Sequence, residues 1–322
     1  MTMINMKWAI NQALQEEMRR DPSVVIVGED VGTGGVFAVT RGLREQFGEW
    51  RVKDTPISED AIAGLGVGAA FAGMRPVIEI MFNDFFTVSL DPICSQAATV
   101  QWLCGKGFKL PMVVRTMCGT GFGAGMHHSQ SLEAWLVHKP GLKVVMPSNA
   151  YDAKGLLKAA IRGDSPVIFM EHKACYTLKS EVPDAEYLLP IGVADVKREG
   201  SDVSVVTYGR LVHTVLAAAA RLDQDGVSAE VLDLRTLSPL DEDAIVNSVK
   251  KTGRLVVVQE AQKRCSVGAE VAAVAAEKAM DYLEAKIKRV TPPPIPVPFG
   301  SAEKFYAPQE EDIIKAVREI VG

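Results

Sequence analysis

The sequence predicts an α/β protein with two domains, each built on a mainly parallel sheet. Its 322 residues are enough for two hydrophobic cores. Short runs of β-branched residues recur between helical patterns, and their nearly continuous apolar character is typical of strands covered on both faces. A polar stretch from His172 to Asp202, with Pro183 and Pro190, separates a first series of such elements from a second one.

The first series lies before His172. Its apolar runs predict strands at 24–27, 77–81, 112–115, 143–146 and 167–171. The segments between these runs predict helices at 5–19, 60–73, 87–103 and 150–162. Alternation of this kind is typical of parallel α/β domains.

The second series begins after Asp202 and alternates in the same way. It predicts strands at 203–208, 230–234, 255–259 and 287–290. Helices are expected at 211–223, 241–251, 267–282 and 309–320. The segment TPPPIPVPFG at 291–300 is too rich in proline for either element, so we expect it to run extended across a surface as a tether.

Composition and charge exclude several classes of protein. The net charge of −5 comes from interspersed acids and bases without a basic stripe, so a nucleic acid is not an expected partner. The N-terminal residues show no secretory signal, and the most apolar stretch, Ala61 to Met74, is too short to span a membrane. Five scattered cysteines without CxxC spacing indicate neither a disulfide framework nor a zinc site. A reducing cytoplasm is therefore the expected location.

Glu59 is a carboxylate with unusual neighbours in the sequence. Residues 54–73 read DTPISEDAIAGLGVGAAFAG, so Glu59 precedes a segment that has no polar face. Burial can raise the pKa of a carboxyl by about 3–5 units, whereas a helix N-terminus favours the charged form by only about 0.3–1 kcal/mol. On one interpretation Glu59 enters an apolar interior and shares a proton with a ring nitrogen or another base. The alternative, which this segment by itself favours because acids are common in the first turn of a helix, is that Ser58 caps a helix whose dipole Glu59 and Asp60 complement.

Other unusual side chains follow predicted strands, where ligands bind in open parallel sheets. Glu29 follows the first strand. Met81 and Phe85 follow the next one, and they form either part of the core or an apolar slot for a flat heterocycle. If the strands are neighbours, these side chains face one crevice.

A glycine-rich loop, CGTGFGAGMHHSQ at 118–130, follows the predicted strand at 112–115. Its glycines let the backbone approach a ligand closely or move as a lid. It carries His127 and His128, which point opposite ways if the chain is extended, so at most one of them enters a site as a proton donor. A histidine with a purely local role in the loop is the alternative. His213, in a predicted helix, is interpreted as structural.

Several motifs follow one another along the chain, namely GEDVG…GGVF…DTPISEDAIAG, RPVIEIMFNDF, HHSQSLEAW, GLKVVMPSNAYDAKGLL and DLRTLSPLD. Taken together, they resemble the beta subunit of the thiamine-diphosphate-dependent dehydrogenase component of 2-oxo acid dehydrogenase complexes. The resemblance extends essentially from end to end. Within the family, VVRTMCGTG, EHK at 171–173, VTYGRLVH, EAQKRCS and VTPPPIPVPF look most like the acetoin dehydrogenase branch, with pyruvate dehydrogenase next.

The resemblance implies a transketolase-type pyrimidine-binding domain at 1–185 and a transketolase C-terminal-type domain at 186–322. It implies that Glu59 hydrogen-bonds the aminopyrimidine ring of thiamine diphosphate and that His128 serves the substrate and the acyl-transfer step. The positions that line the ring are Ile57, Met81 and Phe85. The acids that match a proton path between paired active sites are Glu29 and Asp91. A structural potassium site, with Gly163 in place of a more usual Asp, is implied at the backbone carbonyls of Met112, Ala160, Ile161, Gly163 and Ser165.

The implied activity is carbon–carbon bond cleavage and acyl transfer to a lipoyl group. The cofactor's own imino group is the base for this chemistry, and a neutral Glu59 supports the required tautomer. The family's GDG…N segment, which binds Mg²⁺ and the diphosphate, is missing, since the only GD, at 163–164, is followed by Ser and Pro. We therefore expect an alpha subunit to hold Mg²⁺ and to complete each site in a heterotetramer. The dihydrolipoyl acyltransferase core of the complex is the second expected partner.

Several alternatives remain open at this point. The substrate is acetoin, pyruvate or a branched-chain 2-oxo acid. In a non-catalytic nucleotide-binding or assembly module, the glycine-rich loop would bind phosphate and the acids would cap helices. A stand-alone transketolase-like enzyme is disfavoured because the diphosphate motif is missing.

Overall fold

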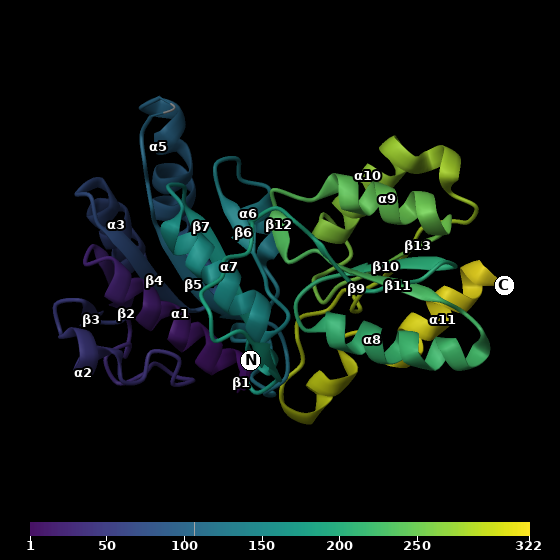
Figure 1. Cartoon of the computed structure of the whole chain (residues 1–322), viewed down its shortest axis with the longest axis horizontal. Coiled ribbons are helices and arrows are strands. Elements are labelled where there is room, and N and C mark those ends of the chain that lie inside the picture. The colour runs from purple at the N-terminus through teal and green to yellow at the C-terminus, as the bar shows by residue number, and fades with distance from the viewer. Residues whose placement is uncertain (106) are drawn as a thin grey trace. The chain divides into compact units, whose positions relative to one another are not determined.

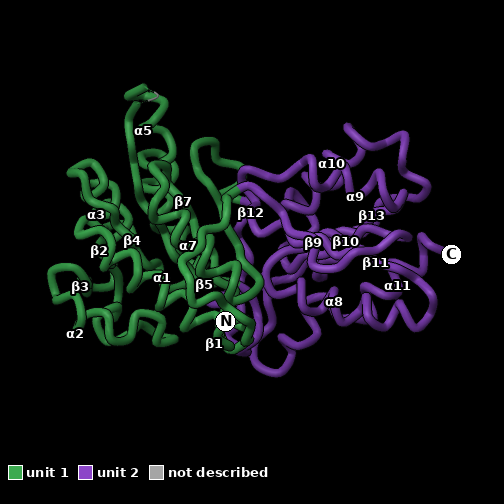
Figure 2. The backbone as a smooth tube through the Cα atoms, in the orientation of Figure 1, with its two compact units in different colours: residues 1–118, 135–191 green, residues 119–134, 192–322 purple. Residues whose placement is uncertain are grey.

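The structure is a computed structural model that describes residues 1–105 and 107–322. The chain forms two compact units, which differ in colour in Figure 2. Unit 1 comprises residues 1–118 and 135–191, and unit 2 comprises residues 119–134 and 192–322. Both units are α/β, as the sequence predicts. The predicted change of domain after residue 185 stays a prediction.

Unit 1 is built on a parallel sheet in which the strands follow the order β6-β7-β5-β4-β2-β3. Its strands are β1 (Thr2–Asn5), β2 (Val24–Gly28), β3 (Val52–Asp54), β4 (Arg75–Phe82), β5 (Val113–Cys118), β6 (Lys143–Val145), β7 (Val167–His172) and β8 (Lys179–Val182). Its helices are α1 (Met6–Arg20), α2 (Leu43–Phe47), α3 (Glu59–Phe71), α4 (Phe86–Leu90), α5 (Ala98–Leu103) and α7 (Ala150–Arg162). The short helix α6 (Glu133–Val137) lies where the chain returns from unit 2 to unit 1.

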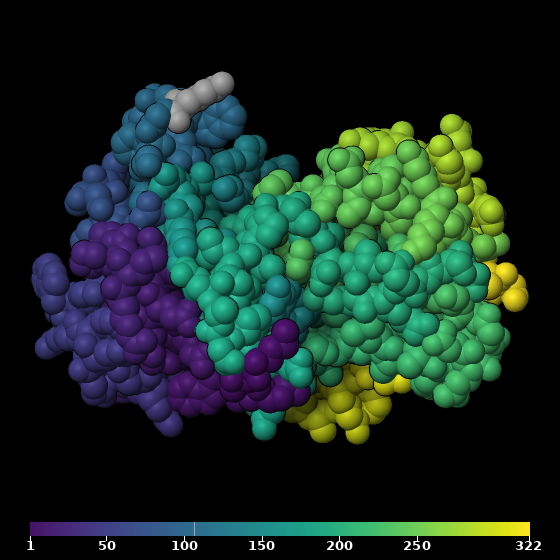
Figure 3. Space-filling model, in the orientation of Figure 1, coloured from purple at the N-terminus to yellow at the C-terminus, as the bar shows by residue number. Residues whose placement is uncertain are grey.

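The central strands of unit 1 are buried on both faces, because every residue of β2, β5 and β7 is buried. Helices α1 and α7 lie side by side on the face of the molecule seen in Figure 3, where α1 is purple and α7 is teal. Ion pairs join these two helices, such as Lys158 to Glu16 at 2.6 Å. The buried core explains why apolar runs located these strands so well in the sequence.

Unit 2 contains a sheet with the order β14-β13-β10-β11-β9, in which β9 alone runs antiparallel to its neighbour. Helices α8 and α11 cover one face, and α9 and α10 cover the other (Figure 1). The strands are β9 (Asp195–Arg198), β10 (Val203–Thr207), β11 (Ala229–Asp233), β12 (Thr236–Ser238), β13 (Leu255–Val258) and β14 (Lys288–Val290). The helices are α8 (Leu211–Leu222), α9 (Glu242–Thr252), α10 (Val267–Ala279) and α11 (Glu310–Val321). Across the part of the chain that the structure describes, no helix has the length and apolar character that crossing a bilayer requires.

Two predictions about elements were wrong in detail. The single helix predicted at 87–103 is α4, a π-helical segment at Asp91–Ala97 and then α5, and Pro92 within this segment lacks the N–H that a regular helix would use. The stretch at 172–202, predicted to be irregular, contains β8 and β9. Both strands pair antiparallel, and most of their residues are not buried. They therefore lack the continuous apolar run that identified the central strands.

Helix α3 has an exposed side, which corrects the expectation that its apolar segment is enclosed. Leu65 and Phe71 are about half exposed, at 48% and 51%. Added Cβ atoms at Gly64 and Gly68 would meet no atom within 4 Å. These positions share one face at helical spacing. The opposite face packs on β4, where Gly66 contacts Ile78. In this chain alone, α3 therefore presents an apolar stripe to its surroundings.

Candidate active site

The candidate site in unit 1 lies where β2 and β4 end. These strands are adjacent and parallel, with Val24–Gly28 paired to Arg75–Glu79. Their carboxyl ends therefore leave the same edge of the sheet. The segment before α3 reaches this edge as well, because the N–H of Thr55 donates to the carbonyl of Gly28 at 3.1 Å. The fold thus brings the segments that carry Glu29, Glu59 and Met81 to one end of the sheet.

Glu29 is a buried acid without full hydrogen bonding. Its side chain is nearly enclosed, with 8% of the residue exposed, and its Oε1 atom has no hydrogen-bond partner among the described residues. Burial raises the pKa of Glu29, and the negative charges of Glu59, Asp30 and Glu79 raise this pKa further. Glu29 and Glu59, which the resemblance places in separate roles, are therefore electrostatic neighbours.

Glu59 is the first residue of α3 and is half-buried. Ser58 occupies the N-cap position, but its side chain makes no capping hydrogen bond. The alternative that Ser58 caps the helix is therefore correct in position and wrong in mechanism. Ile57 is 82% exposed, so it does not line an enclosed cavity in this chain alone. A partner or ligand would have to cover Ile57 if it is to contact a heterocycle.

Met81 and Phe85 are half-buried at the end of β4 and in the 3₁₀ turn Asn83–Phe85. The rings of Phe82 and Phe85 pack edge to face with centroids 5.9 Å apart. Both predicted apolar residues also pack against the core of unit 1, so the core and the slot interpretations each describe part of their surface. Asp91, by contrast, is exposed at the start of the π-helical segment. Its part in a proton path with Glu29 stays a prediction.

A buried charge network beneath this edge was missed in the sequence. The guanidinium of Arg115, which is 2% exposed, donates to both carboxylate oxygens of Glu171 at 2.7 and 2.8 Å and to Glu79 at 2.6 Å. The hydroxyl of Tyr176 also donates to Glu171, at 2.6 Å. Burial raises the pKa of Glu79 although Arg115 opposes this shift. The sequence did contain a sign of this network, because Glu79, Arg115 and Glu171 each interrupt a mainly apolar strand and these three strands are neighbours.

The carbonyls of the predicted potassium site are already engaged. The guanidinium of Arg75 donates to the carbonyls of Ile161 at 3.0 Å and Gly163 at 2.8 Å, and it also binds Asp164. The carbonyl of Met112 accepts from the N–H of Val167 at 2.9 Å. An arginine cation thus satisfies two of the five carbonyls, which does not fit a free cage for a metal ion. The potassium site stays a prediction.

The glycine-rich loop belongs to unit 2. Its two ends meet where the N–H of Gly119 donates to the carbonyl of Gln130 at 3.0 Å. Four of its residues have positive φ values that only glycine adopts without strain, namely Gly119, Gly121, Gly123 and Gly125. Carboxylates accept hydrogen bonds from its backbone, since Glu260 binds the N–H of Thr120 and Glu303 binds the N–H groups of Gly121 and Gly123. These N–H groups are therefore not free for a phosphate, which argues against the nucleotide-binding alternative.

The two histidines of the loop differ in exposure. His127 ends the 3₁₀ turn Gly125–His127 and is exposed, whereas His128 follows it and is half-buried. The N–H of His128 donates to the carbonyl of Gly125 at 3.2 Å, which closes the turn. The difference agrees with the expectation that at most one histidine of the pair turns inward. Its role, like those of the other predicted site residues, stays a prediction.

Comparison with known families identifies both parts of the chain. Residues 2–179 match the transketolase pyrimidine-binding domain, and residues 192–313 match the transketolase C-terminal domain. Among solved structures, an inactive beta4 tetramer of a split-gene transketolase has a TM-score of 0.80 at 22% identity and covers 99% of this chain and 98% of that chain. Transketolase from Leishmania mexicana gives a TM-score of 0.74 at 17% identity, over 100% of this chain and 46% of that chain. These structures establish the fold.

Characterised relatives match over almost the whole chain. The 2-oxoisovalerate dehydrogenase subunit beta of Bacillus subtilis is 51% identical over 316 residues, which are 97% of each chain. The subunit beta of acetoin:2,6-dichlorophenolindophenol oxidoreductase from Cupriavidus necator is 48% identical over 98% of this chain and 97% of its own. The pyruvate dehydrogenase E1 component subunit beta of Bacillus subtilis is 46% identical over 100% of this chain and 98% of its own.

Proposed function

The chain belongs to the family of beta subunits of the thiamine-diphosphate-dependent dehydrogenase component of 2-oxo acid dehydrogenase complexes. From this membership we propose that Glu59 binds the aminopyrimidine ring of the cofactor. When bound, thiamine diphosphate supplies a carbon nucleophile that cleaves a carbon–carbon bond beside a carbonyl group. The observation that carries the proposal is the buried, incompletely hydrogen-bonded Glu29 at the end of the sheet, the edge that the segment before Glu59 also reaches.

The residues around Glu59 suit the flat, partly apolar ring of the cofactor. Met81 and Phe85 offer half-buried apolar surface at the end of β4, and Ile57 offers exposed apolar surface before α3. Burial and the negative charges around it raise the pKa of Glu29. In this proposal Glu59 shares a proton with a ring nitrogen of the cofactor. The Oε1 atom of Glu29, which has no hydrogen-bond partner among the described residues, would then find one in the bound complex.

His128 is proposed to move protons during acyl transfer to a lipoyl group. It lies on a loop whose ends are joined by the hydrogen bond from the N–H of Gly119 to the carbonyl of Gln130. A histidine suits this task because its ordinary pKa lies near neutral pH.

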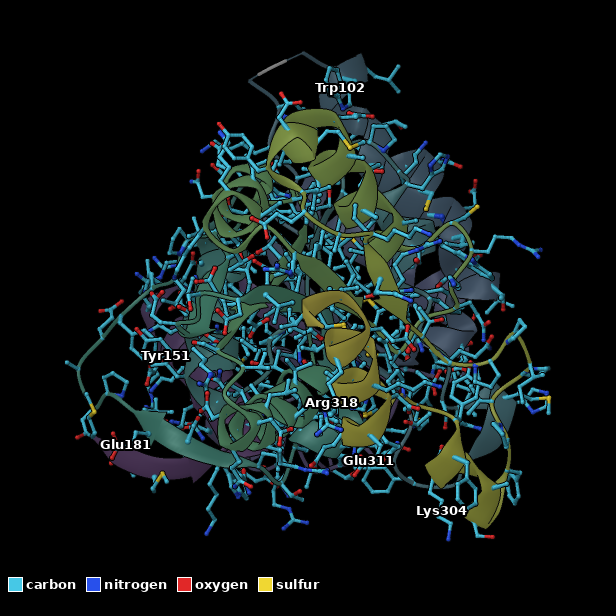
Figure 4. The ribbon with its side chains drawn as sticks, turned by 90° about the vertical axis from the view of Figure 1, so that its right-hand side faces the viewer. Trp102, Tyr151, Glu181, Lys304, Glu311 and Arg318 are labelled. Carbon is cyan, nitrogen blue, oxygen red and sulfur yellow. The ribbon has the colours of Figure 1, made fainter. Side chains whose placement is uncertain are left out.

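An alpha subunit is proposed to hold Mg²⁺ and the diphosphate in a heterotetramer. Support comes from the missing GDG…N segment and from exposed apolar side chains in unit 1. Beyond the stripe on α3, Trp102 and Leu103 at the end of α5 are 77% and 81% exposed, and Figure 4 shows Trp102 at the tip of this helix. The dihydrolipoyl acyltransferase core is proposed as the second partner.

Acetoin is proposed as the substrate, with pyruvate and branched-chain 2-oxo acids as the alternatives. Relatives named for the three substrates have identities of 51%, 48% and 46%, so sequence similarity does not separate them. Parallel assays of the reconstituted complex with the three substrate classes will decide.

The replacement Glu59→Gln in the reconstituted complex tests the site. We expect turnover to fall by about two to four orders of magnitude, the range typical of a lost proton-transfer group. Asp60→Asn, one residue further on, is the matched control and should retain activity. Near-normal turnover of Glu59→Gln would refute the assignment. Activity of the purified chain alone, with thiamine diphosphate and Mg²⁺, would refute the need for an alpha subunit.

A further inference from the structure

The glycine-rich loop that carries His128 is held by side chains far away in the sequence. The Oε2 atom of Glu303 accepts the N–H of Gly121 at 2.9 Å and the N–H of Gly123 at 2.6 Å. The Oε1 atom of Glu260 accepts the N–H of Thr120 at 2.6 Å. Three of four consecutive residues of the loop thus donate to two carboxylates. Hydrogen bonds to a charged acceptor are about twice as strong as bonds between neutral groups.

Glu303 itself is buried and has a fixed environment. It lies in the 3₁₀ segment Gly300–Phe305, which follows the proline-rich stretch, and it is 5% exposed. Its second oxygen, Oε1, is buried and has no hydrogen-bond partner among the described residues. The two loop N–H groups are therefore the contacts that stabilise its charge. A buried carboxylate with this arrangement is costly unless the loop stays in place.

The segment before Glu303 adds a second layer of contacts. The N–H of Gly300 donates to the carbonyl of Gly123 at 2.9 Å, and Phe299 and Ala124 form an antiparallel bridge. The approach is so close that a Cβ atom added at Gly125 would lie 2.8 Å from the ring of Phe299. Residues 119–125 are therefore clamped directly before the turn that ends in His127 and His128.

On another side, the loop borders open space. A cavity of about 950 Å³ in unit 2 is lined in part by the loop residues Met126 and Gln130. Four positive-φ glycines give the loop many alternative conformations once its hydrogen bonds are lost. The loop thus has both the space and the backbone flexibility to move. The contacts with Glu303, Glu260 and residues 299–300, which we call the clamp, hold it in one of its conformations.

We propose that Glu303 is a positioning residue for the reaction: its carboxylate fixes the loop so that His128 is placed for acyl transfer. This inference rests on the role proposed above for His128. Glu303 acts through the backbone and not on the reacting atoms. Loss of its charge should therefore impair the step that needs His128 more than the step that precedes it.

The test uses the complex reconstituted with its alpha subunit and two assays. Transfer to a lipoyl domain reports acyl transfer, and reduction of 2,6-dichlorophenolindophenol reports the preceding cleavage without a lipoyl group. The variants are Glu303→Gln, which keeps the shape and removes the charge, Glu303→Ala, His128→Ala and the double variant His128→Ala/Glu303→Gln. Lys304→Gln is the control, since Lys304 is exposed beside Glu303 and lies at the surface in Figure 4.

We expect Glu303→Gln to lower lipoyl transfer about tenfold, because neutral hydrogen bonds are roughly half as strong as charge-assisted ones. Dye reduction should stay within about twofold, and the double variant should transfer no more slowly than His128→Ala, as expected for residues that act through one another. If Glu303→Ala does not fold, Glu303→Gln decides the matter. Equal losses in both assays, additive losses in the double variant, or an unchanged Glu303→Gln would overturn the inference. Normal transfer by His128→Ala would overturn the proposed role of His128 instead.

Discussion

Replacement of Arg115 by Met would remove the guanidinium that contacts both Glu79 and Glu171 in the interior of unit 1. Methionine fills a similar volume, so the change isolates the charge from the packing. Breaking a buried ion pair by removing one partner costs about 3–5 kcal/mol, because a buried charge is left uncompensated. Here two carboxylates lose their partner. With a urea m-value of about 3 kcal/mol/M, the unfolding midpoint of the full chain should fall by about 1–1.7 M.

The control for this prediction is Arg44→Met. Arg44 pairs with Asp54 at 2.8 Å, but both side chains are partly exposed, so the change should cost no more than about 1 kcal/mol. The assay is urea unfolding followed by circular dichroism at pH 5 and pH 8. In Arg115→Met the two carboxyls should bind protons on folding, so their pKa values in the folded state would lie above the unfolded values. The destabilisation should then grow as the pH rises. A midpoint shift no larger than that of Arg44→Met, or one that shrinks towards pH 8, would refute the reasoning.

Three further predictions concern Glu29, Arg75 and the predicted potassium site. The pKa of Glu29 is raised on folding, so the folded protein binds this proton more readily than the unfolded chain and the stability that it contributes is lost as the pH rises. The melting temperature of Glu29→Gln should therefore change less between pH 5 and pH 8 than that of the wild type. Arg75→Ala should lower the melting temperature by about 4–8 °C, as its contacts with Ile161 and Gly163 are worth about 2 kcal/mol. Exchange of NaCl for KCl should leave the wild-type melting temperature unchanged; a rise specific to potassium would instead support the predicted metal site.

The central strands of the sheets could be predicted, because strands that are buried on both faces consist of nearly continuous apolar residues. Strands β2, β4, β5 and β7 in unit 1 were located in this way. Strands β1 and β8 could not be located in this way, because they form a largely exposed two-stranded ribbon. Its pairing joins residues far apart in the sequence, such as Thr2 and Val182. Its stability depends on the partner strand and not on a local pattern.

The candidate site was predictable to a similar extent. The rule that ligands bind beyond strand ends located Glu29, Met81 and Phe85, since it needs only the strands. The clamp on the loop could not be found because Gly121 and Glu303 are separated by 182 positions in the sequence. The contact between Arg115 and Glu79 was easier to predict than this clamp, because the two residues are paired directly on the neighbouring strands β4 and β5.

A segment from the first half of the sequence belongs to unit 2, and this limits where the chain can be cut into independent fragments. Residues 119–134 belong to unit 2 but are encoded inside unit 1. A fragment that begins at residue 192 would keep Glu260 and Glu303 but lose the N–H groups of Thr120, Gly121 and Gly123 that these acids bind. In such a fragment the buried carboxylate of Glu303 would lose the two N–H groups that bind it, which costs stability. A cut at residue 192 would thus separate the glycine-rich loop from the two acids that bind its backbone, although all of these residues belong to the same unit.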